Sequence, residues 1–103
     1  VKNRDTCTPI GPGLVDAADV PNPMALKLQT TVNGQVTQSG NTADMVFDVP
    51  TLIEYFSSFM TLQAGDLILT GTPDGIVNVN PGDVVVTEIE GIGALTNTIV
   101  GRP

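Results

Sequence analysis

The chain has 103 residues, of which 41% are apolar, and a formal net charge of −7 from 11 acidic and 4 basic side chains. This length fits one domain or part of one, and the apolar content argues against disorder. The basic residues form no cluster that could contact phosphates, which argues against nucleic-acid binding. No apolar run approaches the roughly 20 residues that span a membrane.

Residue counts exclude several kinds of site. The chain has no His, which excludes zinc sites of the Cys/His type and Ser-His or Cys-His catalytic pairs. The single Cys7 cannot form an internal disulfide, and a reduced, cytoplasmic setting is the default. We expect Cys7 to be a packed small residue rather than a nucleophile. The first residue is Val1 and no signal-peptide pattern follows, so we expect a processed chain or part of a longer protein.

The N-terminal quarter and the first hairpin come first along the chain. Six Pro and Gly residues punctuate residues 1–25, which predicts irregular structure without a long helix. Residues 26–32 read as a strand, and residues 35–38 as its return strand. Asn33-Gly34 between them is a strong hairpin signal, because both central residues of a type I′ turn need a positive φ.

Residues 49–60 carry the one helical pattern. Apolar side chains recur there at helical spacing, and the stripe is predicted to be core rather than a binding groove. Asp48 can cap the N-terminus, and Pro50 is tolerated in the first turn. The stripe consists of Val49, Leu52, Ile53, Phe56, Phe59 and Met60.

The remaining sequence predicts short strands joined by turns. Residues 67–70 read as a short buried strand after Gly65-Asp66, and residues 84–90 and 94–100 as the last two strands. Turns are predicted at residues 81–83 and 91–93. Strands joined this way favour antiparallel pairing, so the predicted fold class is mainly β with one helix (α+β).

Two groups of residues could carry chemistry. Thr70-Gly71-Thr72-Pro73 follows a predicted strand, where Gly71 would let a ligand approach the backbone and Thr72 offers a hydroxyl to a carboxylate. An ordinary turn is the alternative. Lys2, Arg4 and Asp5 lie together near the start, where an isolated surface cluster is the alternative. Asn41 to Asp44 could be capping chemistry before the helix.

Four segments, in order and covering essentially the whole chain, resemble the fumarylacetoacetate hydrolase family. They are Lys2–Thr6 with Pro9–Pro12; Val32–Gly34 with Gln38 and Thr42–Phe47; the helix with Thr61–Asp66; and Leu69–Gly75 with Pro81–Val84 and Gly91–Gly93. The Lys-x-Arg-Asp start and Asn-Thr-Ala-Asp-Met are most similar to the branch that isomerises 2-hydroxyhepta-2,4-diene-1,7-dioate and decarboxylates 5-oxopent-3-ene-1,2,5-tricarboxylate.

The resemblance implies a fold and an activity. Residues 1–103 would be the C-terminal part of a catalytic domain with a mixed β-sandwich or β-roll, incomplete here and with an exposed sheet edge. The full-length protein would be a homodimeric isomerase/decarboxylase acting on small carboxylic acids in aromatic catabolism, whereas this segment alone would be inactive. An acylpyruvate hydrolase, an oxaloacetate decarboxylase and a non-catalytic remnant remain alternatives.

The resemblance also implies roles for particular residues. Mg²⁺ or Mn²⁺ would be held by two Glu and one Asp upstream of this segment, and would polarise a 2-oxo acid. Lys2 matches the family's active-site lysine, Asp5 would orient Lys2 or the loop, and Thr6 matches a second cation position in some members. Thr72, beside Gly71, matches a threonine that contacts the substrate carboxylate.

Overall fold

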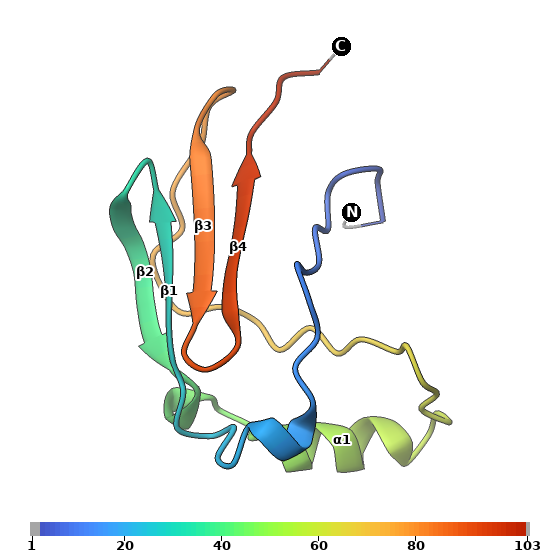
Figure 1. Ribbon diagram of the computed structural model, residues 1–103. Helices are drawn as coiled ribbons and strands as arrows, with labels where there is room; N and C mark the ends of the chain where they lie inside the picture. Colours follow the sequence, from blue (N-terminus) through green and yellow to red (C-terminus); the bar gives the residue numbers. More distant parts are fainter. Residues whose placement is uncertain (1–2, 103) are drawn as a thin grey trace.

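A four-stranded antiparallel sheet forms the body of the protein (Figure 1). The computed structural model describes residues 3–102. Within them the sheet has the strand order β2-β1-β3-β4, which confirms the predicted class of mainly β with one helix. The elements, in order, are η1 (Ala17–Asp19), β1 (Lys27–Val32), β2 (Gln35–Asn41), η2 (Thr42–Asp44), α1 (Val49–Ser57), β3 (Val84–Ile89) and β4 (Gly93–Thr98).

The first hairpin forms as predicted and carries a bulge. Asn33 has φ 51° and Gly34 has φ 80°, the left-handed geometry that a type I′ turn requires. β2 extends to Asn41, three residues beyond the predicted end. Thr30 pairs with Gln38 and Thr31 with Val36, so Thr37 is an extra residue in β2. Such a bulge bends an edge strand and changes the direction of its side chains.

The side chain of Asn33 ties the first hairpin to the second. Its Nδ2 donates to Asp83 Oδ1 (3.0 Å), and its Oδ1 accepts from the N–H of Val84 (2.9 Å). These bonds fix the start of β3, which pairs with β1 from Leu28↔Ile89 to Val32↔Val85. The sheet is therefore held by local turns on either side and by one long-range strand pair in the middle.

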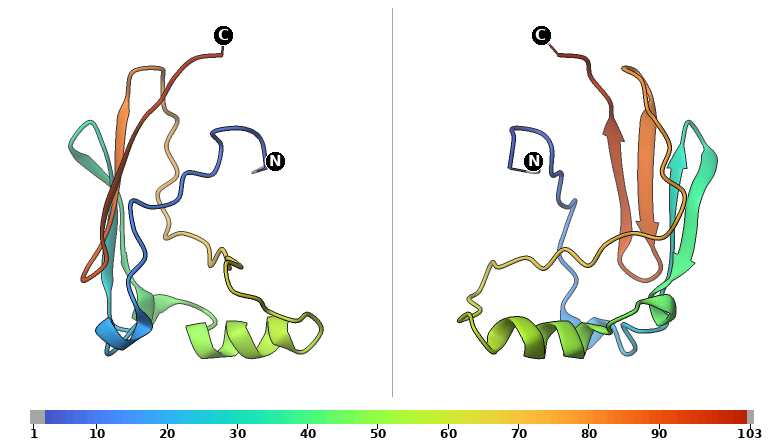
Figure 2. Two further views of the ribbon diagram at one scale, coloured as in Figure 1. Left: turned by 45° about the vertical axis from the view of Figure 1, so that its right-hand side comes forward. Right: turned by 180° about the vertical axis from the view of Figure 1, so that it is seen from behind.

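The helix α1 lies beyond one end of the sheet in all three views (Figures 1 and 2). Asp48 caps it, accepting from the Thr51 N–H at 2.8 Å, and Pro50 occupies the first turn as expected. The helix ends at Ser57, three residues before the predicted end. None of its residues is buried, and Ile53 and Phe59 are exposed. The prediction that its apolar stripe is core is therefore wrong for the described residues, because Val49, Leu52 and Phe56 are only half-buried and the rest of the stripe is exposed.

The predicted strand at residues 67–70 is also wrong. These residues have no strand hydrogen bonding in the described structure, and Leu67 and Leu69 are 56% and 64% exposed. The segment between α1 and β3 crosses one face of the sheet instead, as the rear view of Figure 2 shows. Its apolar sequence resembles a strand, but no described strand lies beside residues 67–70 to pair with them.

The described residues share little interior. None of them falls in the buried class, although the turns at residues 81–82 and 90–92 form as predicted. The accessible surface is 8157 Å², against roughly 5,500 Å² expected for a compact monomer of this mass. The radius of gyration is 15.0 Å, against about 13 Å expected. No described helix has the length and apolar character of a membrane span.

Candidate functional site

A hollow of about 690 Å³ opens between the end of the sheet and the loop of residues 70–74. β1 and β3 contribute one side chain each, and the end of β2, η2 and the chain leading into α1 form a second wall. The loop of residues 70–74 forms the opposite wall. The lining residues are Leu28, Ser39, Gly40, Asn41, Thr42, Asp44, Met45, Val46, Phe47, Leu52, Thr70, Gly71, Thr72, Pro73, Asp74 and Ile89.

The lining combines an apolar part with a polar part. Carbon-rich side chains come from the strands, from the chain before α1 and from α1 itself. Hydroxyls and an amide come from Ser39, Asn41, Thr42, Thr70 and Thr72. A concave site of this size, with a few polar groups beside apolar ones, is typical of small-molecule binding.

Local hydrogen bonds hold the wall at residues 41–44. Asn41 caps η2, because its Oδ1 accepts from the Ala43 N–H at 2.9 Å. Thr42 Oγ1 donates to the Pro23 carbonyl (2.6 Å) and accepts from the Leu26 N–H (3.0 Å). The capping chemistry predicted for this segment is therefore confirmed. It also fixes one wall of the hollow against the residues that precede β1.

The predicted site residues fall in two places. Gly71 and Thr72 both line the hollow, and Gly71 has φ 88°. Asp5 and Thr6 lie in an exposed turn near the N-terminus, where Thr6 has φ 62°, and neither lines the hollow. Lys2 lies outside the described residues. The described structure thus brings together two of the five predicted positions.

The environment of Cys7 differs from the prediction. Its N–H donates to the Arg4 carbonyl at 3.1 Å, within the turn near the N-terminus. The residue is exposed rather than packed, because no described element covers this turn. The expectation of a packed small residue is therefore wrong for this structure.

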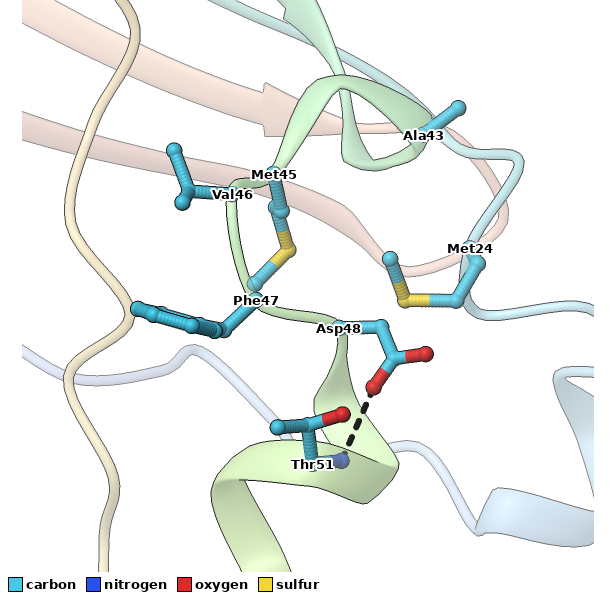
Figure 3. Close-up of a pocket in the computed structure, with 7 residues that line it drawn as sticks. All are labelled: Met24, Ala43, Met45, Val46, Phe47, Asp48 and Thr51. Carbon is cyan, nitrogen blue, oxygen red and sulfur yellow. Dashed lines mark hydrogen bonds between the residues drawn. The ribbon is translucent and has the colours of Figure 1, made fainter.

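A second, shallower hollow of about 450 Å³ adjoins the first at Met45, Val46 and Phe47 (Figure 3). Its floor includes the α1 cap, where Asp48 meets Thr51. Hydrogen bonds from the side chain and then the backbone of Thr51 lower the pKa of the Asp48 carboxyl. These bonds belong to the helix end, so the carboxylate of Asp48 has a structural role.

The lining of the main hollow carries a net negative charge. Two acidic residues, Asp44 and Asp74, and no basic residue are among its described lining residues. Within residues 3–102, no three His, Cys, Asp or Glu side chains gather as a metal site. Because Mg²⁺ and Mn²⁺ favour several oxygen ligands, the described residues do not fit a complete divalent-metal site.

Sequence reasoning missed the wall formed by Ser39 to Phe47. The Asn-Thr-Ala-Asp segment indicated a cap, and a cap explains its hydrogen bonds. Its second role depends on the loop at residues 70–74 lying opposite, and no local pattern in the sequence encodes that proximity. The Thr-Gly-Thr-Pro loop carried the one available signal, a glycine beside a hydroxyl after an apolar run.

These features define the class of a β-rich domain with a small-molecule hollow at one end of its sheet. Residues 1–100 match the family model described as fumarylacetoacetate (FAA) hydrolase C-terminal. The chain belongs to the fumarylacetoacetate hydrolase family. It is 57% identical over 100 residues to the 4-hydroxyphenylacetate degradation bifunctional isomerase/decarboxylase of Salmonella dublin, covering 97% of this chain and 23% of that enzyme.

Two solved structures show the same fold in longer chains. The 2-hydroxyhepta-2,4-diene-1,7-dioate isomerase from Mycobacterium marinum has a TM-score of 0.87 and 47% identity, covering 94% of this chain and 37% of that one. The maleylpyruvate hydrolase from Sphingobium sp. SYK-6, in complex with manganese(II) and pyruvate, has a TM-score of 0.86 and 39% identity. That match covers 89% of this chain and 35% of the hydrolase. The present chain thus spans less than two-fifths of each of these relatives.

Proposed function

We propose that this chain is a segment of an isomerase/decarboxylase that acts on 2-oxo or 2-hydroxy-dienoic di- and tricarboxylic acids in aromatic-compound degradation. Within it, the loop around Thr72 would contact the substrate. The 57% identity with the Salmonella enzyme is the observation that carries this proposal. At that identity the fold is shared, but a substrate has to be argued from the site.

The hollow supports a small carboxylic acid as its ligand. Thr72 Oγ1 would donate a hydrogen bond to a substrate carboxylate, and Gly71 lets the backbone approach that group closely. The apolar wall would receive the carbon chain of the acid, and the carboxylate end would face the loop. This arrangement fixes the orientation of the acid before any bond changes.

The charge of the hollow implies a cation from elsewhere. A di- or tricarboxylate would meet the negative charges of Asp44 and Asp74 with no basic side chain among the described lining residues. Lys2 and a divalent metal are the proposed sources of positive charge. The metal, Mg²⁺ or Mn²⁺, would be held by carboxylates outside this segment. When bound it would polarise the 2-oxo group of the substrate.

A hydrolase acting on an acylpyruvate is the second candidate. The structural match to the manganese- and pyruvate-bound maleylpyruvate hydrolase favours it. Both candidates share a 2-oxo acid end, so the loop at Thr72 would have the same role in each. The reactions differ in what happens farther along the carbon chain.

We further propose a homodimeric, cytoplasmic protein.

The test is an assay of the complete gene product with Mg²⁺ or Mn²⁺. Turnover of 2-hydroxyhepta-2,4-diene-1,7-dioate or of 5-oxopent-3-ene-1,2,5-tricarboxylate, well above that of maleylpyruvate, supports the isomerase/decarboxylase. The reverse order supports the hydrolase, and turnover of none contradicts both.

Thr72→Val should raise KM about 10-fold, since it removes one hydrogen bond to a charged group. Thr61→Val, at an exposed position outside the hollow, is the matched control.

A further inference from the structure

We propose that Gln38 is a positioning residue that holds the substrate loop in place from the edge strand β2. The inference rests on the proposed function, because it assigns to Gln38 an effect on substrate binding that acts through Thr72. Gln38 does not itself line the hollow. Its link to the site is the substrate loop, residues 70–75, which includes the wall of the hollow formed by residues 70–74.

The link is a single directed hydrogen bond. Gln38 Nε2 donates to the carbonyl oxygen of Pro73 at 2.8 Å, across 35 residues of sequence, and Gln38 is half-buried. Pro73 follows Thr72, so this bond fixes the Pro73–Asp74 peptide group, one residue beyond the proposed substrate-binding hydroxyl. The Pro73 carbonyl thereby has a side-chain donor that holds the loop against β2.

Two glycines allow β2 and the loop to approach each other. A Cβ on Gly40 would lie 3.1 Å from Pro73 Cγ. A Cβ on Gly75 would collide with the carbonyl oxygen of Thr37 and lie 3.2 Å from Gln38 Cγ. The contacts on either side of Gln38 are therefore tight: a Cβ at Gly75 would force the loop or the strand to shift, and a Cβ at Gly40 would require Pro73 to move by a few tenths of an ångström.

The bulge in β2 lies at the centre of these contacts. Thr37 is the extra residue of the β1–β2 pairing, and its Oγ1 donates back to the Thr30 carbonyl at 3.2 Å. The neighbouring carbonyl of Thr37 faces Gly75, and the next side chain, Gln38, reaches Pro73. Bulges are found next to active sites because they alter the direction of side chains, which is the effect seen here.

The experiment compares Gln38→Met with Gln35→Met in the complete gene product. Both substitutions replace an amide with an apolar side chain of similar length in the same strand, but Gln35 is exposed at the start of β2, whereas Gln38 is half-buried at its centre. The probe is pyruvate binding in the presence of Mn²⁺, measured by calorimetry. Gln38→Met should weaken binding about 10-fold, whereas Gln35→Met should leave it unchanged.

A double-variant cycle with Thr72→Val separates positioning from general damage. If Gln38 acts through Thr72, Gln38→Met should weaken binding by less than about 2-fold in the Thr72→Val background. Equal effects in both backgrounds would overturn the inference, and so would unchanged binding by Gln38→Met alone. If Thr72→Val leaves binding unchanged, the substrate contact of the proposed function is wrong and the role of Gln38 is wrong with it.

Hydrogen–deuterium exchange tests the bond without any ligand. In the complete gene product with Gln38→Met, those amides of residues 70–72, 74 and 75 that the native protein protects should exchange at least about 5-fold faster, while amides of β3 should not change. Unaltered exchange in the loop would overturn the inference even if the protein bound no pyruvate.

Gln38→Glu adds a check, because a protonated Glu can donate to Pro73 whereas the carboxylate cannot. Its loop exchange, corrected for the pH dependence measured in the native protein, should therefore slow on acidification toward pH 4.

Discussion

Individual polar side chains at the ends of elements fix much of this structure. Asp48 and Asp83 each accept a backbone N–H at the start of a helix or turn. The pKa of Asp83 is lowered by the Asn80 N–H and then by the Asn33 side chain. Such bonds favour the charged form of the carboxyl.

Acidification should remove the contribution of Asp83 to stability. Its folded pKa lies below the unfolded value of 3.8, so the stabilisation is complete above that pH and is lost as pH falls through the folded pKa. In denaturant unfolding of the complete protein, the difference between the native protein and Asp83→Asn should be largest near pH 6 and shrink toward pH 3. Glu90→Gln, at an exposed turn, is the control. A difference that grows on acidification would contradict this assignment.

Gly75 is the residue where backbone geometry and close approach act together. It has φ 116°, and an added Cβ would meet the Thr37 carbonyl oxygen. Gly75→Ala should therefore destabilise the complete protein by about 1–3 kcal/mol, through left-handed strain and the displaced loop. The measurement is thermal or denaturant unfolding. Gly13→Ala is the matched control, because nothing lies within 4 Å of its added Cβ. Equal stability of both variants would argue against the tight contact.

Local sequence chemistry predicted most elements of this fold. The Asn33-Gly34 turn, the Asp48 cap and the last hairpin depend on residues adjacent in the chain, and all three are found. The misjudged segment, residues 67–70, depends on which strand lies beside it. The Ser39–Phe47 wall of the hollow depends in the same way on a distant loop. Local periodicity in the sequence does not predict which distant segment lies beside either one.

The β1–β2 hairpin should respond to its turn residue. Asn33→Ala would place Ala at φ 51°, a left-handed conformation that Ala tolerates poorly. It would also remove both side-chain hydrogen bonds to the start of β3. The backbone term alone costs about 1–2 kcal/mol. Denaturant unfolding should show at least that loss, with Asn33→Gly between Asn33→Ala and the native protein. Asn78→Ala, in an exposed loop, serves as the control. A neutral Asn33→Ala would mean that the turn does not limit stability.

At the scale of the whole molecule, exposed apolar surface is the main feature. Large side chains such as Leu14, Val46 and Ile76 are each 91% exposed, and the strands β2 and β4 are the two edges of the described sheet. Exposed apolar surface on this scale is typical of faces that contact other protein. We infer that protein outside these 103 residues covers it.

The isolated segment should therefore behave unlike the complete gene product. Expressed alone, residues 1–103 should self-associate or bind a hydrophobic dye such as ANS, because exposed edges and apolar faces favour association. Analytical ultracentrifugation and dye fluorescence measure both effects, with the complete protein as the control. A monomeric, dye-silent segment with cooperative unfolding would contradict the inference that its surface needs a cover.

The contact between Thr72 and the substrate is most directly tested by a crystal structure of the complete gene product with Mn²⁺ and pyruvate. We expect pyruvate in the hollow lined by Thr72, with its carboxylate about 2.7–3.0 Å from Thr72 Oγ1. Pyruvate bound away from this loop, with Thr72 Oγ1 making no contact to it, would contradict the proposed function.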